Sequence, residues 1–150
     1  MSQKTHIAQT APFRWENVPV LAYKEDAGTH FRNITRQVLF DEGEASGSQL
    51  RYFEIAPGGH STLERHEHVH SVMVLRGRGQ ALVGGEIHSL GTNDLVRVPP
   101  QTWHQFRATA DEPLGFLCLV RSERDKPQRP SADELAALKA DKHVGSFVRA

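Results

Sequence analysis

Glycine is concentrated in the middle of the chain, and this distribution constrains the fold more than any other feature of the sequence. Ten of the twelve glycines lie between Gly43 and Gly115, where they separate short stretches rich in Val, Leu, Ile and Phe. Short apolar stretches bounded by glycine are typical of β-strands joined by tight turns. The central part of the chain is therefore predicted to be all-β.

At least eight short strands are predicted. They cover residues 31–40, 49–56, 69–75, 80–83, 86–90, 95–98, 103–108 and 115–121. Gly84-Gly85 predicts a two-residue hairpin, because the favoured turns need positive φ angles, and Pro57-Gly58-Gly59 predicts another turn. Since no helical pattern separates these strands, the sequence favours an antiparallel barrel or sandwich over an alternating β/α fold.

The two ends of the chain differ from its centre. A capping box at Ser131–Glu134 begins a short helix that extends to about Lys142 and is expected to lie outside the barrel. Residues 1–25 show little predicted structure. We therefore expect an N-terminal arm (1–25), a barrel (26–125), and a C-terminal helix and tail (126–150).

Charge and cysteine content limit the class of protein. Eighteen basic residues balance eighteen acidic ones, so no net field attracts nucleic acid or an anionic membrane. A single cysteine, Cys118, excludes an intrachain disulfide and fits a reducing compartment. No segment is long and apolar enough for a signal peptide or a membrane span. These features predict a cytoplasmic protein that binds neither nucleic acid nor membrane.

Four of the nine histidines occur within one stretch of eleven residues, and imidazole is the commonest metal ligand in proteins. On a strand, residues two apart face the same way about 6.6 Å apart, so Glu64 and His66 can point at one ion. An extended chain would place His70 about 13 Å from His66. His70 therefore joins the same ion only if the chain turns between Glu67 and Val69.

A fourth ligand has to come from another strand, and His104, which follows the Pro99-Pro100 turn, is the candidate. Three imidazoles and one carboxylate suit one divalent transition metal, with Fe, Mn, Ni, Co, Cu and Zn all compatible. Calcium and magnesium prefer shells made of oxygen atoms. His68 stays open as an alternative to His70.

These residues resemble the first sequence motif of the cupin superfamily. That motif reads glycine, five residues, His-x-His, three or four residues, glutamate, six residues and glycine. Gly58, Glu64-x-His66, His70 and Gly77 keep every spacing, with glutamate and histidine exchanged at two ligand positions.

The second cupin motif resembles residues 93–104, which end on His104. In this stretch Asn93 and Gln101 replace two turn glycines, a change that puts the shapes of those turns in question. Together the two motifs match residues from roughly 49 to 120, about half of the chain.

The resemblance implies the cupin double-stranded β-helix, a jelly-roll barrel, with a short C-terminal helix. It also implies that Glu64, His66, His70 and His104 hold one divalent metal ion. The register set by the motif places His70 on the inner face and His68 in the turn near solvent.

A substrate pocket is expected beside the metal. Phe53 and Ile55 share one strand face, and Phe106 contributes another apolar wall. Arg51 has the same parity as Phe53, so it either holds an anionic substrate group inside the barrel or lies at the surface. Cys118 is interpreted as a buried core residue. No catalytic base separate from the ligands is identified.

Two classes of function stay open. One is a metal-dependent enzyme, foremost a dioxygenase-type oxidoreductase acting on a small oxygenated or aromatic compound, with isomerase, decarboxylase and lyase chemistry as alternatives on the same fold. The other is a non-catalytic cupin that binds or senses a small molecule. A homodimer is expected, with the arm, Tyr52 and Trp103 as the partner surface.

Overall fold

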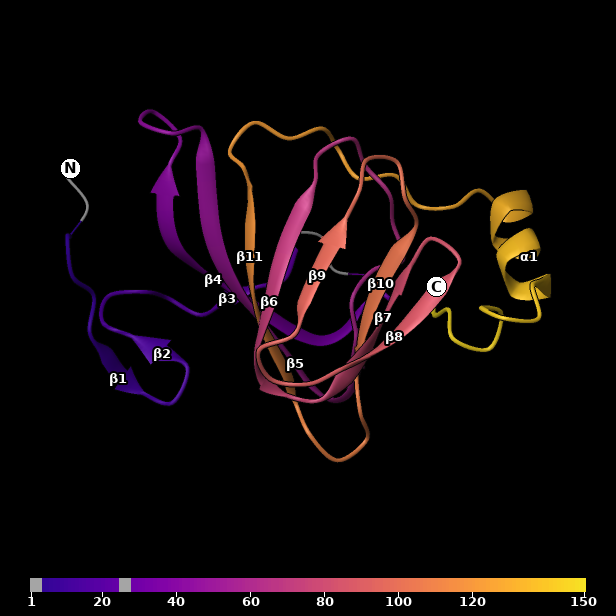
Figure 1. Ribbon diagram of the computed structural model, residues 1–150, viewed down its shortest axis with the longest axis horizontal. Coiled ribbons are helices and arrows are strands. Elements are labelled where there is room, and N and C mark those ends of the chain that lie inside the picture. The colour runs from indigo at the N-terminus through magenta and orange to yellow at the C-terminus, as the bar shows by residue number, and fades with distance from the viewer. Residues whose placement is uncertain (1–3, 25–27) are drawn as a thin grey trace.

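The computed structural model describes residues 4–24 and 28–150. The predicted boundary between arm and barrel, at residues 25 and 26, lies outside them. The described elements, labelled in Figure 1, are β1 (Gln9–Ala11), β2 (Arg14–Trp15), β3 (Leu21–Ala22), β4 (Arg32–Glu42), β5 (Ser48–His60), β6 (His70–Gly77), β7 (Gly79–Val83), β8 (Glu86–Leu90), β9 (Leu95–Val98), β10 (His104–Ala108), β11 (Leu114–Arg121) and α1 (Ala132–Ala140).

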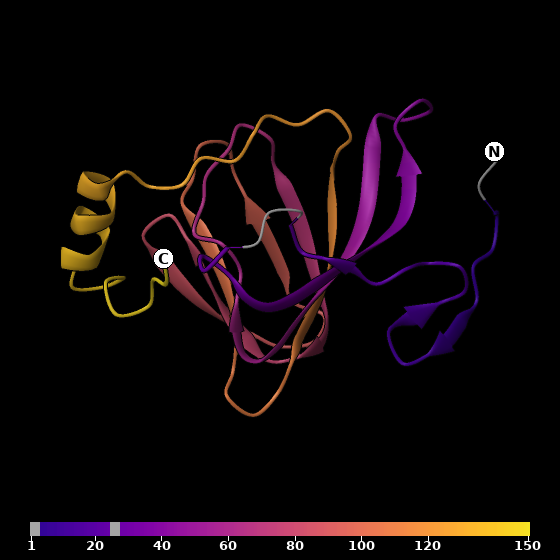
Figure 2. The ribbon, with the colours of Figure 1, turned by 180° about the vertical axis from the view of Figure 1, so that it is seen from behind.

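One curled antiparallel sheet forms the body of the molecule. Its strands follow the order β8-β7-β10-β5-β11-β6-β9, and β4 and β3 add beside β5. Seen from both sides, the strands wrap around a common interior, with α1 outside at one end and the β1-β2 hairpin at the other (Figures 1 and 2). The all-β jelly-roll prediction is confirmed, and so is the hairpin across Gly84-Gly85, which joins β7 and β8.

The turn predicted at Pro57-Gly58-Gly59 is instead a bend inside β5. Gly58 has a φ of 76°, and the register between β4 and β5 shifts at this point. The chain stays in the sheet because the Gly58 N–H donates to the Thr109 carbonyl at 2.8 Å and the Ser61 N–H donates to the Phe106 carbonyl at 2.9 Å. Before the bend β5 pairs with β11, and after it β5 pairs with β10, the strand that begins at His104.

A second apolar cluster lies outside the barrel, under the C-terminal tail. It consists of Leu63, Leu82, Val144, Phe147 and Val148. The capping box that begins α1 is present at Ser131 and Glu134. Gln105 holds the tail by accepting from the Arg149 N–H at 2.9 Å and donating to the Arg149 carbonyl at 2.6 Å. The C-terminal segment is therefore part of the packed structure.

The two residues expected to meet a partner both pack against other parts of the chain. Tyr52 is completely buried, with its ring 5.5 Å from Phe13 and 5.4 Å from Trp15 of the arm. Trp103 packs against the second cluster, with the Arg65 guanidinium 4.4 Å from its ring centre. The homodimer and its surface stay a prediction; the arm covers Tyr52, whereas Trp103 is half-buried. Among the described residues, no helix has the length and apolar character needed to span a membrane.

Candidate metal centre

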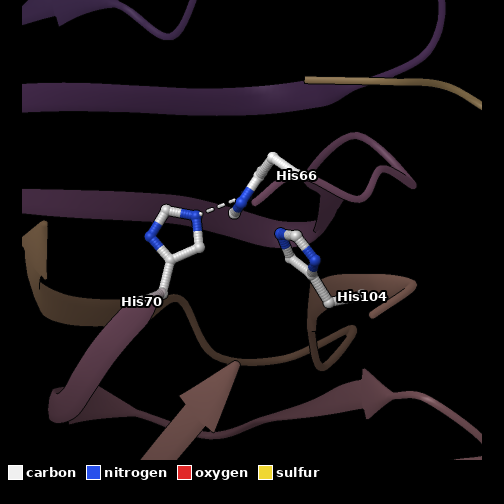
Figure 3. Close-up of side chains that lie close together, drawn as sticks. All are labelled: His66, His70 and His104. Atoms are coloured by element: carbon white, nitrogen blue, oxygen red, sulfur yellow. Dashed lines mark hydrogen bonds between the residues drawn. The ribbon is translucent and has the colours of Figure 1, made fainter. Parts of the chain in front are cut away.

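Three histidines from separate parts of the barrel converge on one point. His66 lies in the loop before β6, His70 begins β6 and His104 begins β10. One ring nitrogen from each lies within 4.8 Å of the others, and Figure 3 shows the three rings facing a common centre. The predicted bend between Glu67 and Val69 is present and brings His66 and His70 together.

Two turns of the second motif keep the conformation that glycine would give them. Asn93 and Gln101 have φ angles of 74° and 51°, in the left-handed region that glutamine rarely adopts. The Gln101 N–H donates to the His66 carbonyl at 2.7 Å. This strained turn therefore fixes the loop that carries His66.

Backbone carbonyls fix the orientation of two of the rings. The His66 Nδ1–H donates to the His68 carbonyl at 2.7 Å, and the His104 Nδ1–H donates to the Thr102 carbonyl at 3.0 Å. Since a carbonyl only accepts, each ring carries its proton on Nδ1 and leaves its Nε2 as an acceptor, which in His66 faces the His70 Nε2. Metal-binding histidines are commonly oriented in this way.

The spacing between His66 and His70 fits shared ligation. Their Nε2 atoms lie 2.9 Å apart, and the His70 Nδ1 lies 2.9 Å from the Cys118 Sγ. Two nitrogens about 2.1 Å from one ion and at right angles to each other would lie about 3.0 Å apart. The donor set of three imidazoles therefore fits a divalent transition-metal ion.

Burial keeps all three rings neutral. Burial, followed by the charges of the neighbouring His104 and His68, lowers the pKa of His66 to about 4. Burial also lowers the pKa of His70 well below its usual value and lowers the pKa of His104. Neutral imidazole is the form that binds metal, so the cluster is in its binding form near neutral pH.

Glu64, the fourth predicted ligand, lies beside the cluster but is engaged elsewhere. Its backbone pairs with His104, and its carboxylate forms an ion pair with Lys24, with Nζ and Oε2 2.7 Å apart. The side chain is buried. The structure thus brings three of the four predicted ligands together, and the Glu64 carboxylate, whose Oε2 is on Lys24, lies outside this group.

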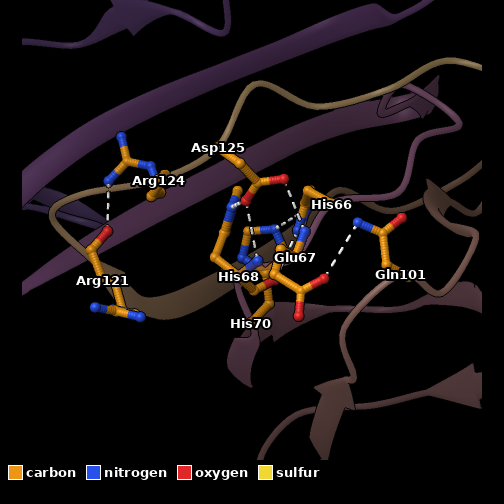
Figure 4. Close-up of polar contacts among 8 residues, drawn as sticks. All are labelled: His66, Glu67, His68, His70, Gln101, Arg121, Arg124 and Asp125. Carbon is orange, nitrogen blue, oxygen red and sulfur yellow. Dashed lines mark hydrogen bonds and ion pairs between the residues drawn. The ribbon is translucent and has the colours of Figure 1, made fainter.

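His68 does not lie near solvent as expected. Only 9% of it is exposed, and its ring stacks on the His66 ring with centres 3.6 Å apart. Its Nδ1 lies 2.8 Å from the Asp125 carboxylate, which also accepts from the backbone N–H groups of Glu67 and His68 (Figure 4). The Glu67 N–H is the largest cause that holds the pKa of Asp125 below its usual range. Asp125 therefore turns His68 inward.

A cavity of about 220 Å³ opens beside the histidines. Of the four predicted pocket residues, Arg51, Phe53 and Phe106 line it, whereas Ile55 is completely buried between β4 and β11. Cys118 also lines the cavity, so it is more than a core residue. Sequence reasoning missed several polar lining residues, namely Tyr23, Lys24, Arg36, Thr62, Arg124 and Asp125.

Comparisons with known proteins agree with this geometry. Residues 51–120 match the Cupin_2 family, described as a cupin domain. A Rhodospirillum rubrum protein named 1-methylthio-D-xylulose 5-phosphate methylsulfurylase is 56% identical over 136 residues, which cover 91% of this chain and 86% of that protein. The chain belongs to the cupin family.

Two further relatives bear on this cupin. A crystal structure of a cupin 2 conserved barrel domain protein from Rhodopseudomonas palustris is 50% identical, with a TM-score of 0.91, and the match covers 97% of this chain and 100% of that one. A Bradyrhizobium protein named 5-nitrosalicylic acid 1,2-dioxygenase is 32% identical over 93 residues, covering 62% of this chain. The match spans only 42% of that dioxygenase.

Proposed function

We propose that this cupin is a metal-dependent enzyme that removes the methylthio group from a 1-methylthio ketose phosphate and passes it to a thiol. The observation that carries the proposal is a set of three neutral imidazoles, two of which, His70 and His104, line a cavity suited to a small molecule. The 56% identity to the Rhodospirillum rubrum methylsulfurylase supports this substrate class.

The proposed reaction balances with a small-molecule thiol as acceptor. The bond between C1 and sulfur breaks, and a sulfur–sulfur bond to the acceptor forms. The thiol proton moves to C1, so the products are a 1-deoxy ketose phosphate and a methyl disulfide. Reduction of the carbon is matched by oxidation of the thiol. A divalent metal ion, when bound, supplies Lewis acidity to the carbonyl next to C1.

The residues of this chain would bind the metal ion and the substrate and exclude water from the cavity. His66, His70 and His104 would hold the metal ion, while stacked phenylalanines, Phe53, Phe116 and Phe106, form an apolar wall. Burial, followed by the charge of Glu64, raises the pKa of the Tyr23 phenol, which hydrogen-bonds Thr62. Tyr23 therefore stays protonated as a neutral hydrogen-bond donor beside the cavity.

The dioxygenase class is a second candidate. It is supported by the 32% identity to the Bradyrhizobium dioxygenase and by the same phenylalanine wall. The ring centres of Phe106 and Phe116 lie 4.7 Å apart, and stacked rings of this kind also suit an aromatic ligand. This reaction would consume oxygen, whereas methylthio transfer would not.

One assay separates the two candidates. Purified protein, loaded in turn with each compatible divalent metal, is incubated with 1-methylthio-D-xylulose 5-phosphate and a thiol with and without oxygen, and the products are identified by mass spectrometry. We expect the 1-deoxy ketose phosphate and the methyl disulfide under both conditions, and none with His104→Ala. Oxygen uptake with nitrosalicylate, without methylthio transfer, would favour the dioxygenase. Failure of both reactions would contradict both candidates.

A further inference from the structure

We propose that Arg51, Arg36 and Arg124 form an anion subsite that binds the phosphate group of the substrate. The inference rests on the proposed function for the identity of the phosphate-bearing compound, but phosphate binding itself can be measured without turnover. All three side chains line the cavity that contains the histidines.

Arg51 is a buried cation without an anionic partner. Only 8% of the residue is exposed, and its Nε has no hydrogen-bond partner. One Nη lies 4.0 Å from the Cys118 Sγ, and the guanidinium carbon lies 4.8 Å from the centre of the Phe53 ring. Among the described residues, no carboxylate pairs with this guanidinium. Because buried charges are ordinarily paired, the vacant donors of Arg51 indicate a ligand anion.

Arg36 lies on the same inner face of the sheet. It pairs directly with Phe53 across β4 and β5, so Arg51, two residues before Phe53, is its diagonal neighbour. The Arg36 Nε donates to the Ala22 carbonyl at 3.0 Å, and within the described part of the chain it has no carboxylate partner. Two like charges so placed repel each other, and an anion bound between them would offset this repulsion.

Arg124 adds a third guanidinium at the solvent-exposed side. One Nη donates to the Arg121 carbonyl at 3.0 Å (Figure 4) and to the Gln49 Oε1 at 3.4 Å. Burial, followed by the positive charge of Arg51, lowers the pKa of Arg124, and Arg36 adds to the effect. The charges of Arg51 and Arg36 therefore both act on Arg124, while Cys118 and Asp41 act in the opposite direction.

The carboxylates of the cavity wall do not relieve this repulsion. Glu64 pairs with Lys24 at 2.7 Å, and Asp125 is held by His68 and two backbone N–H groups. Three guanidinium groups offer the planar sets of donors that match phosphate oxygens. A phosphate dianion is thus the ligand that best satisfies this side of the cavity.

The position of the subsite also fits a short sugar phosphate. Cys118 lies between the two sides, because its Sγ is 4.0 Å from the Arg51 Nη and 2.9 Å from the His70 Nδ1. A compound of a few carbons can therefore place its phosphate at Arg51 and its opposite end at the histidines.

Calorimetric titration of metal-free protein with inorganic phosphate tests the subsite. We expect the wild-type protein to bind phosphate and Arg51→Met to bind it about tenfold more weakly or worse, since hydrogen bonds to a charged group are lost. Arg36→Met should weaken binding in the same direction. Arg78→Met, which removes a guanidinium that is 76% exposed and does not line the cavity, is the matched control and should leave affinity unchanged.

A second readout separates loss of binding from loss of folding. Because Arg51→Met replaces an unpaired buried charge with an apolar side chain of similar length, its Tm in phosphate-free buffer should be equal to or above that of the wild type. Added phosphate should raise the Tm of the wild type but not of this variant.

Two results of the binding measurement would overturn the subsite: no phosphate binding by the wild type, or equal phosphate affinity in wild type and Arg51→Met. Phosphate binding without methylthio transfer would instead contradict the proposed function alone. Methylthio transfer with a KM unchanged by Arg51→Met would contradict the subsite alone.

Discussion

The histidine side of the cavity and its arginine side differ in how their polar groups are satisfied. On the histidine side, irregular loops supply a backbone acceptor to each of His66 and His104 and a carboxylate to His68. On the arginine side, Arg36 and Arg51 lie on regular strands, and the buried Nε of Arg51 has no partner.

This difference indicates two kinds of ligand. Neutral rings with their protons fixed on Nδ1 present lone pairs and attract a cation, whereas clustered guanidinium groups present donors and attract an anion. A molecule that meets a metal ion at one end and carries a phosphate at the other satisfies both sides at once.

Replacing a histidine ligand should have the largest effect. His70→Ala removes a proposed direct metal ligand, so metal affinity should fall by more than the roughly 10–100-fold typical of losing a residue that only supports a ligand. His68→Ala removes the ring stacked on His66 and should cost less than His70→Ala. Competition with a chromophoric chelator at fixed pH measures both. A larger loss for His68→Ala would assign His68, rather than His70, to the metal.

Lowering the pH should have the second-largest effect, a decrease in the free energy of unfolding caused by the buried histidines. Because the folded-state pKa of His66 is about 4, the unfolded chain takes up protons below about pH 6.5 that the folded protein does not. Each such group lowers the free energy of unfolding by at most about 1.4 kcal/mol per pH unit, down to its folded pKa. Above about pH 6.5 these groups should give no pH dependence.

Chemical denaturation between about pH 4 and 8 checks this sign. The metal-loaded protein should lose metal over the same acidic range, since protons compete for the ring nitrogens. Stability that rises as the pH falls from about 6.5 to 5 would show that the histidines are charged in the folded state.

Loosening the bend at Glu67 and His68 should have the smallest effect. Asp125→Ala removes an acceptor from two backbone N–H groups and from the His68 ring. Since water can reach this carboxylate, which is 36% exposed, we expect a loss of about 1 kcal/mol in the free energy of unfolding. Asp111→Ala, on an exposed loop, serves as the control. No difference between the two variants would mean that Asp125 does not hold the bend.

Much of the fold was predictable because it depends on local rules. Alternating apolar residues, the Gly84-Gly85 hairpin and the capping box at Ser131 all act over a few neighbouring residues. The convergence of His66 and His70 could also be predicted. An extended strand would hold the two residues too far apart to share an ion, so shared ligation requires a bend between them, and the bend is observed.

The remaining parts of the site depend on contacts between distant segments. Asp125 lies 57 residues from His68, and no local pattern predicts that it turns this ring inward. The neighbourhood of Arg36 and Arg51 depends on the register of β4 against β5, which shifts at the bend near Gly58. The ion pair between Lys24 and Glu64 likewise joins two distant segments, the end of the predicted arm and the residues next to the histidine cluster.

The central claim is that His66, His70 and His104 hold one divalent transition-metal ion. It is tested most directly by elemental analysis after chelation, reconstitution with each metal and desalting. The account predicts one equivalent per chain for the wild type and for His88→Ala, an exposed control on β8, and less than about a tenth of an equivalent for His104→Ala. A wild-type protein that retains no metal, or a His104→Ala variant that retains a full equivalent, would contradict it.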